Sequence, residues 1–228
     1  MSSSASLLRH LAPRLAKHYG IAAFDRRGHG RTRDSEAPFH YEAMADETIA
    51  FLEYLGEPSH LVGHSDGGVV ALIVAKRRPD LVRRAVVVGA NYHVSGVRPM
   101  PAFDLDGVEF VNWANQFAQL TPDGVEHARI VAQKSQTLLA TEPTMSLDDL
   151  RAINVPVLVM AGDDDVIELA HTCSMYEALR EGQLAIVPGT SHAVLKERPG
   201  HSAKIIRHFL NGASPPVTLT PCRRTGSE

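Results

Sequence analysis

The chain has 228 residues, of which 44% are hydrophobic and 21% are charged, and this is the composition of an ordinary globular protein. The formal net charge is only −3, so the sequence offers no broad basic surface for nucleic acid or an anionic membrane. No apolar run reaches the roughly 18–20 residues of a membrane span, and two cysteines are too few for a disulfide framework. We therefore expect a single cytoplasmic domain that binds neither nucleic acid nor membrane, with its oligomeric state undetermined.

The first predicted element is a helix within residues 1–20. Its apolar positions share one helical face: Leu7, Leu8, Leu11 and Leu15. The segment is also rich in serine and basic residues and has no acidic residue, which is typical of a transit peptide. Because it runs directly into an apolar segment at 21–24 without a linker, we interpret it as an amphipathic helix of the fold.

Strand and helix patterns alternate along the rest of the chain, as in parallel sheets whose strands are joined by helices. The predicted helices are residues 41–55, 67–78, 167–180 and 198–210. The predicted strands are residues 21–24, 59–63, 84–89, 155–161 and 183–187, and their nearly continuous apolar content predicts burial on both faces. The predicted fold class is therefore α/β, with a mostly parallel sheet of about five strands and flanking helices in residues 1–210. Residues 211–228 are predicted to form a disordered tail.

A long segment, about residues 92–150, interrupts this alternation and has helical periodicity. Four of its apolar side chains recur at helical spacing: Phe110, Trp113, Phe117 and Leu120. Part of this face must pack onto the domain, but insertions of such length between core elements usually have a function. We expect a helical cap that covers a pocket, with Trp113 and Phe117 as substrate-binding residues.

Residues 63–67, GHSDG, match the pattern G-x-S-x-G, in which a strand turns sharply into a helix and presents a serine hydroxyl. A buried-strand pattern precedes this segment and a helical pattern follows it, so the context fits the motif. We expect that a Cβ at Gly63 or Gly67 would collide where the strand and the helix approach each other. Ser65 is the candidate nucleophile, and its neighbour His64 is interpreted as a packed residue rather than a base.

A serine hydroxyl is a weak nucleophile that needs a general base, and the base needs an orienting acid. His192 follows the predicted strand at 183–187, and three aspartates at 163–165 follow the predicted strand at 155–161. The carboxyl ends of parallel strands meet at one edge of a sheet, so both groups are expected near Ser65. On this argument alone, all three aspartates are candidates for the acid.

Four segments resemble motifs of the α/β-hydrolase superfamily, and the resemblance covers about residues 7–210. FDRRGHGRT at 24–32 resembles the D-x-R-G-x-G-x-S segment, and GHSDGG at 63–68 resembles the nucleophile elbow. GDDDVI at 162–167 resembles the acid loop, and PGTSH at 188–192 resembles the histidine loop. The elbow and the helical insertion are most similar to small serine esterases and the valacyclovir-hydrolase-like group.

The resemblance implies a catalytic triad of Ser65, His192 and Asp165, because the family's acid stands three residues after the loop glycine. It also implies that the backbone N–H of Asp66 donates to the oxyanion. Complete family members have three strands before the first strand predicted here, and the loop after the third supplies a second oxyanion donor. The expectation is therefore an α/β-hydrolase fold that lacks these N-terminal strands, with weak turnover for the chain as written.

The predicted function is hydrolysis of small carboxylic esters through an acyl-enzyme, without a cofactor or a metal. One alternative is a non-catalytic binding protein or an inactive fragment of the same fold. A second is a cofactor-free perhydrolase, because the same triad would serve that reaction.

The side chain of Asp66 has two interpretations. It can border the pocket, where a carboxylate would attract a cationic substrate group. It can equally stabilise the N-terminal turn of the following helix. The sequence does not decide between them.

Overall fold

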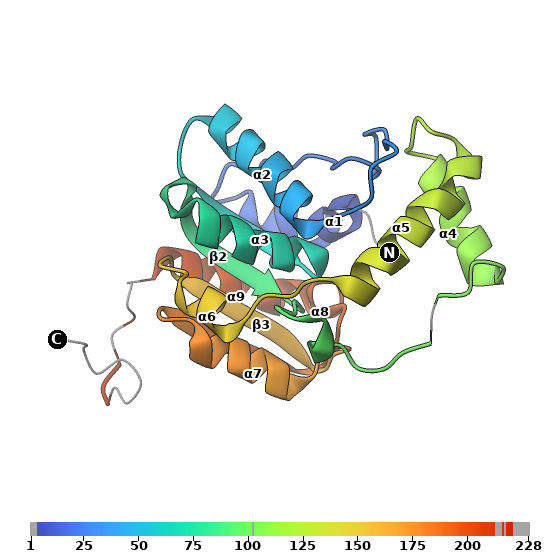
Figure 1. Cartoon of the computed structure of the whole chain (residues 1–228). Helices are drawn as coiled ribbons and strands as arrows, with labels where there is room; N and C mark the ends of the chain where they lie inside the picture. Colours follow the sequence, from blue (N-terminus) through green and yellow to red (C-terminus); the bar gives the residue numbers. More distant parts are fainter. Residues whose placement is uncertain (1–3, 102, 213–215, 217, 221–228) are drawn as a thin grey trace.

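The centre of the protein is a parallel sheet of four strands in the order β1-β2-β3-β4 (Figure 1). The computed structural model describes residues 4–101, 103–212, 216 and 218–220. The strands are β1 (Ser59–His64), β2 (Val82–Val88), β3 (Val157–Asp164) and β4 (Gly182–Ser191), all parallel to their neighbours. Helices lie in each connection between consecutive strands, and the predicted α/β class is confirmed.

Helices surround this sheet, and the four predicted at 41–55, 67–78, 167–180 and 198–210 are present with ends within two residues of the predicted ones. In the described residues they are α1 (Ser4–Leu15), α2 (Tyr41–Leu55), α3 (Asp66–Arg77), α4 (Val108–Ala118), α5 (Ala128–Thr141), α6 (Leu147–Arg151), α7 (Leu169–Ala178), α8 (Val194–Glu197) and α9 (Pro199–Asn211), with short 3-10 turns at Pro79–Leu81, Val94–Gly96 and Val125–His127.

The two faces of the sheet carry separate apolar cores, because successive side chains of a strand point to opposite sides. Ala85 and Val87 of β2 lie in a core with α2, α3, α6 and α7. Val86 and Val88 lie in a second core with α1, α8 and α9. All four side chains are completely buried, and β3 alternates in the same way. Burial of the central strands on both faces, which their apolar sequence predicted, is therefore confirmed.

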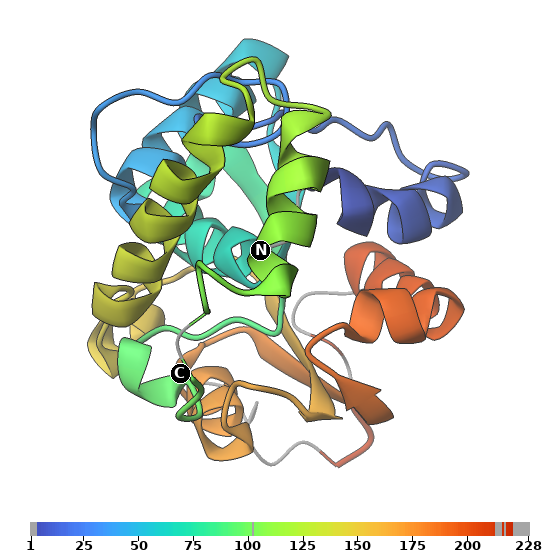
Figure 2. The same ribbon diagram turned by 90° about the vertical axis from the view of Figure 1, so that its right-hand side faces the viewer.

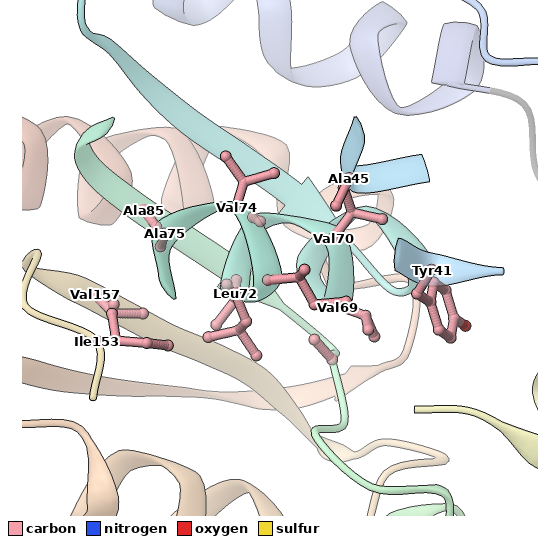
Figure 3. Packing of buried hydrophobic residues seen from close by; sticks show 14 of the residues in the cluster. Tyr41, Ala45, Val69, Val70, Leu72, Val74, Ala75, Ala85, Ile153 and Val157 are labelled. Atoms are coloured by element: carbon pink, nitrogen blue, oxygen red, sulfur yellow. The ribbon is translucent and has the colours of Figure 1, made fainter. Parts of the chain in front are cut away.

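Helix α3 lies between the sheet and α2 and is buried over the whole stretch from Gly68 to Ala75. Figure 3 shows Val69 and Val70 of this helix close to Tyr41 and Ala45 of α2. Each fully buried valine or leucine contributes about 1.5–3 kcal/mol. This packing fixes the N-terminus of α3, directly after Ser65.

Helix α1 lies beside α9 (Figure 2) and packs on the second core through Leu11 and Leu15. The Tyr19 hydroxyl donates to Asn211 Oδ1 at 2.7 Å, so the chain after α1 is joined to the end of α9. The predicted amphipathic helix is present.

The strand predicted at residues 21–24 does not form, so the sheet of the described residues has four strands rather than five. The side chain of Ile21 is 42% exposed, and Phe24 packs on Phe51 of α2 with 4.7 Å between ring centroids. Four apolar residues indicate burial, but a strand also needs a neighbour for its backbone hydrogen bonds. Without a neighbouring strand, the segment instead packs the Phe24 side chain on helix α2.

Helices α4 and α5 share a small apolar cluster of their own, formed by Phe110, Ala114, Ala128 and Ala132. The predicted aromatic face is only partly correct, since Leu120 lies beyond α4 and is 45% exposed.

An ionic cluster, which we call the Asp34 cluster, joins this helix pair to the loop before α2. Asp34 Oδ2 accepts hydrogen bonds from Lys134 Nζ at 2.6 Å and from His127 Nε2 at 2.9 Å. The Asp34 side chain is only 1% exposed. Its backbone N–H donates to Asp123 Oδ2 at 2.7 Å.

No helix among the described residues is long and apolar enough to cross a membrane. Most of the tail predicted at 211–228 lies outside the described residues, and Asn211 belongs to α9 rather than to the tail.

Candidate active site

Ser65 is the single residue between β1 and α3, at the carboxyl edge of the sheet. Its backbone has φ 53° and ψ −122°, and it is the one non-glycine residue with positive φ in the described part of the chain. Such a conformation costs about 1–3 kcal/mol and persists only where the surroundings enforce it. Here the Ser65 N–H donates to Val88 O at 2.9 Å, and the Ser65 carbonyl accepts from Gly68 and Val69.

Two glycines make this sharp turn possible. A Cβ on Gly63 would lie 2.0 Å from the carbonyl oxygen of Gly67, so the strand and the helix can cross only with glycine at 63. The same expectation was wrong for Gly67, where a Cβ would meet nothing within 4 Å. Instead, a Cβ on Gly68 would lie 2.6 Å from Ala90 Cβ. The second tight contact is therefore one residue later than predicted.

His192 and Asp165 lie beside Ser65, each directly after a strand. His192 Nε2 is 3.1 Å from Ser65 Oγ, and His192 Nδ1 is 2.7 Å from Asp165 Oδ1. An ionised carboxylate only accepts, so Nδ1–H donates to Asp165 and Nε2 is left to accept from the serine hydroxyl. The three predicted side chains therefore form one hydrogen-bonded line.

Asp165 is held as an anion. Its side chain is 2% exposed, and Oδ1 also accepts from the Ile167 N–H at 3.1 Å. Burial acts to raise the pKa of Asp165, but its interaction with His192 and the hydrogen bond from the Ile167 N–H outweigh it, so the pKa lies below its usual value. Asp165 Oδ2 is buried and has no hydrogen-bond partner among the described residues.

Gly89, directly after β2, leaves room for this pair. It has φ +56°, and a Cβ there would lie 3.0 Å from His192 Nδ1 and 3.1 Å from Asp165 Oδ2. Gly89 was not predicted as a site residue from the sequence. A glycine directly after a buried strand was the available signal.

The other two aspartates of the acid loop point elsewhere. Asp163 Oδ1 accepts from the Thr190 N–H at 3.1 Å, and the N–H groups of Gly189 and Thr190 hold its pKa below the usual value. Asp163 therefore supports the end of β4, directly before His192. Asp164 is exposed, at the end of β3.

A second carboxylate supports the same end of β4 and was missed from the sequence. Glu197 of α8 accepts from the Ser191 N–H at 2.7 Å and from Ser191 Oγ at 2.8 Å. These bonds hold the pKa of Glu197 below its usual value. No sequence pattern distinguishes Glu197 from other helical glutamates.

The Asp66 carboxylate has protein partners of its own. The buried Tyr41 hydroxyl donates to Asp66 Oδ1 at 2.6 Å. Burial and the Asp66 charge both raise the pKa of Tyr41, so it stays protonated. Burial lowers the pKa of Arg26, an effect that the nearby carboxylates of Asp66 and Glu47 oppose. Asp66 also occupies the first turn of α3, so both interpretations of its side chain remain.

Trp113 and Phe117 lie next to each other on α4, with stacked rings 5.2 Å apart. Both are partly buried, and they pack on the α4–α5 cluster and on the core that contains α2 and α3. Trp113 and Phe117 therefore lie at the contact between the α4–α5 pair and the core that contains α2 and α3.

No group of three or more histidine, cysteine, aspartate or glutamate side chains is placed to hold a metal ion in the part of the chain that the structure describes. The chemistry on offer at Ser65 is nucleophilic attack assisted by a histidine and a carboxylate.

The sequence and the fold are similar to those of known hydrolases and peroxidases. A bifunctional esterase/perhydrolase of Acinetobacter calcoaceticus is 29% identical over 215 residues, which cover 79% of this chain and 77% of that protein. A non-heme haloperoxidase of Rhodococcus erythropolis is 29% identical over 210 residues, with coverage of 77% and 76%. The solved structure of a serine hydrolase involved in carbazole degradation superposes with a TM-score of 0.74 at 21% identity, covering 91% of this chain and 85% of that one. The family model described as the alpha/beta hydrolase family matches residues 2–202. The chain therefore belongs to the α/β-hydrolase family.

Proposed function

We propose that the protein hydrolyses small carboxylic esters, with Ser65 as the nucleophile. The observation that carries this proposal is the hydrogen-bonded line from Ser65 through His192 to Asp165. The esterase named among the relatives supports an ester as the substrate class.

In the first half of the reaction, Ser65 Oγ attacks the ester carbonyl carbon while His192 Nε2 takes the hydroxyl proton. The Asp165 carboxylate stabilises the imidazolium through Nδ1–H. The oxyanion accepts from the Asp66 N–H, which has no intrahelical acceptor because it lies in the first turn of α3. His192 then protonates the leaving alcohol, and an acyl group remains on Ser65.

In the second half, His192 takes a proton from water, which attacks the acyl-enzyme. Collapse of the second tetrahedral intermediate releases the carboxylic acid and returns the proton to Ser65 Oγ. Under this proposal α4 and α5 form a cap, and Trp113 and Phe117 contact the acyl or alcohol group of the substrate.

A fluorophosphonate probe tests the nucleophile directly, with the adduct mapped by mass spectrometry and turnover followed on p-nitrophenyl acetate. We expect labelling at Ser65 and its loss in Ser65→Ala, with Ser95→Ala as an exposed-serine control that keeps both signals. Labelling that survives Ser65→Ala would contradict the proposal. A folded protein with neither labelling nor turnover would favour the non-catalytic alternative.

Perhydrolysis is a second candidate, favoured by the similarity to the esterase/perhydrolase and to the non-heme haloperoxidase. Hydrogen peroxide would replace water in the attack on the acyl-enzyme, so acetate and peroxide would give peracetic acid and water. Peracid formation that depends on Ser65 would add this activity to ester hydrolysis.

A further inference from the structure

His64 lies at the end of β1, directly before Ser65, and its imidazole contacts the turn that carries His192. His64 Nε2 is 2.7 Å from the carbonyl oxygen of His192, and the two ring centroids are 4.8 Å apart. A carbonyl oxygen only accepts, so Nε2 of His64 must carry the proton and donate it. This contact has no part in the mechanism above.

The sheet topology explains why such a contact is useful. Strands β2 and β3 separate β1 from β4, so at ordinary strand spacing the strand β4 itself lies about 14 Å from β1. His192 must therefore reach back across two strand ends to meet Ser65. The last residues of β4 are held away from β1, because Thr190 bonds to Asp163 of β3 and Ser191 bonds to Glu197 of α8. The hydrogen bond from His64 instead ties the backbone of His192 to the strand that carries the nucleophile.

The charge state of His64 fits this role. Burial lowers the pKa of His64, and this effect exceeds the opposing one of the hydrogen bond to the His192 carbonyl. The imidazole is therefore neutral at pH 7, and its Nε2 proton is committed to the carbonyl. It adds no second positive charge beside His192.

We propose that His64 is a positioning residue, which holds the His192 backbone through its Nε2–H and so keeps the His192 imidazole within reach of Ser65. This inference rests on the proposed ester hydrolysis. Asp165 orients the ring of His192 from one side, and His64 fixes the backbone from which that ring extends. A displacement of about 1 Å in a catalytic group can lower turnover by about 100-fold. The loss should therefore fall on kcat, since the contact does not involve the substrate.

Two amide substitutions separate positioning from simple packing. The side-chain nitrogen of glutamine in His64→Gln lies about as far from the backbone as imidazole Nε2, whereas that of His64→Asn is one methylene shorter. Both are neutral, so they differ mainly in reach. With p-nitrophenyl acetate, we expect kcat to fall about 10- to 100-fold in His64→Asn and by less than about 5-fold in His64→Gln, with KM changed by less than about 3-fold in both. His208→Gln and His208→Asn, at an exposed position of α9, serve as controls that leave kcat unchanged.

Equal kcat values for the two folded His64 variants would overturn the proposal. A second measurement needs neither turnover nor a variant: nitrogen NMR of the ¹⁵N-histidine-labelled native chain reports which ring nitrogen of each histidine carries the proton. We expect a neutral Nε2–H tautomer for His64 at pH 7. An Nδ1–H tautomer or an imidazolium would overturn the proposal even if a variant fails to fold. Absence of ester turnover in the native protein contradicts the proposed function instead, and the tautomer still decides whether the contact exists.

Discussion

The carboxyl edge of the sheet and the α4–α5 pair are held in place in different ways. At the sheet edge, Ser65, Asp165 and His192 each follow a strand directly, and backbone hydrogen bonds fix their surroundings. The helix pair has a small apolar cluster of its own and is joined to the loop before α2 by the Asp34 cluster.

This difference indicates that the two regions serve different purposes. In the proposed mechanism Ser65, His192 and Asp165 must meet within about 3 Å, and all three are attached directly to strands of the central sheet. The helix pair joins the rest of the protein through Val131 and Leu138 of α5, which lie in the core with α2 and α3, and through the polar Asp34 cluster. None of these contacts involves the proposed reacting groups, so changes in the helix pair should alter substrate choice or stability with little effect on those groups. Substitutions in the two regions should therefore affect different measured quantities.

The largest effect is expected for Asp165→Asn, which should lower kcat by about 10⁴-fold because the wrong tautomer of His192 would be favoured. Asp163→Asn and Asp164→Asn should cost less than about 10-fold, since neither carboxylate contacts His192. Steady-state kinetics on p-nitrophenyl acetate measures all three. If Asp164→Asn were the most damaging, the acid would be misassigned.

Asp34→Asn should change stability rather than chemistry. It removes the charge that Lys134 and His127 face, and we expect the free energy of unfolding to fall by about 2–3 kcal/mol in urea at pH 7. Fluorophosphonate labelling of Ser65 should be unchanged. Asp106→Asn is the matched control, because Asp106 pairs with Arg129 on the same helix pair but is 86% exposed, and it should cost less than about 0.5 kcal/mol.

The Asp34 cluster also predicts a pH dependence. Burial acts to raise the pKa of Asp34, but hydrogen bonds from Lys134 and His127 outweigh it and hold the pKa below the usual value. The folded chain therefore binds fewer protons than the unfolded chain in this range. The stabilisation is complete above about pH 5 and is lost as the pH falls through the folded value. A smaller difference in unfolding free energy between native and Asp34→Asn proteins at pH 3 than at pH 7 would bear this out.

Substitutions on α4 should change selectivity. Trp113→Leu and Phe117→Leu are expected to change the ratio of kcat/KM for a bulky acyl ester over an acetyl ester by about 10-fold. Val111→Ala, at a half-exposed position on the same helix, should leave this ratio unchanged. A constant ratio in all three variants would remove the helix pair from substrate recognition.

The smallest effect is expected for Asp66→Asn. If the carboxylate borders the pocket, the preference for an amino-acid ester over its des-amino analogue should fall, but only about 2- to 5-fold. The Tyr41 hydroxyl and the nearby Arg26 already offset part of the Asp66 charge. An unchanged preference would leave the helix-turn interpretation.

The elements that position the site were predictable because apolar strand patterns alternate with helical patterns along the chain, and the two kinds of pattern support each other. The central strands β2 and β3 have long apolar stretches that are buried on both faces, whereas the edge strands β1 and β4 are only partly buried, contrary to the prediction. The predicted range 41–55 matches α2 at both ends. The segment at 21–24 has only the apolar signal, and a sequence does not state whether a backbone partner is available. Of the three aspartates, Asp165 was selected by the family resemblance rather than by spacing.

The contacts that support the site were not predictable from the sequence. His64 and His192 are 128 residues apart, and their contact depends on how far a turn reaches across two strand ends. The bond from Ser191 to Glu197 forms because the short helix α8 turns back toward the end of β4. Local sequence patterns predict neither of these two contacts.

The left-handed backbone of Ser65 sets a limit on engineering this protein for heat resistance. A domain is stable by only about 5–15 kcal/mol, and the strain at this one residue is about 1–3 kcal/mol. Glycine would relieve most of that strain, because it adopts positive φ freely, but it would also remove the hydroxyl. A search for thermostable variants that scores stability alone would therefore select against the proposed nucleophile at position 65. Stabilising changes have to be sought away from the turn at Ser65, for example in the loop before α2 that contains Asp34.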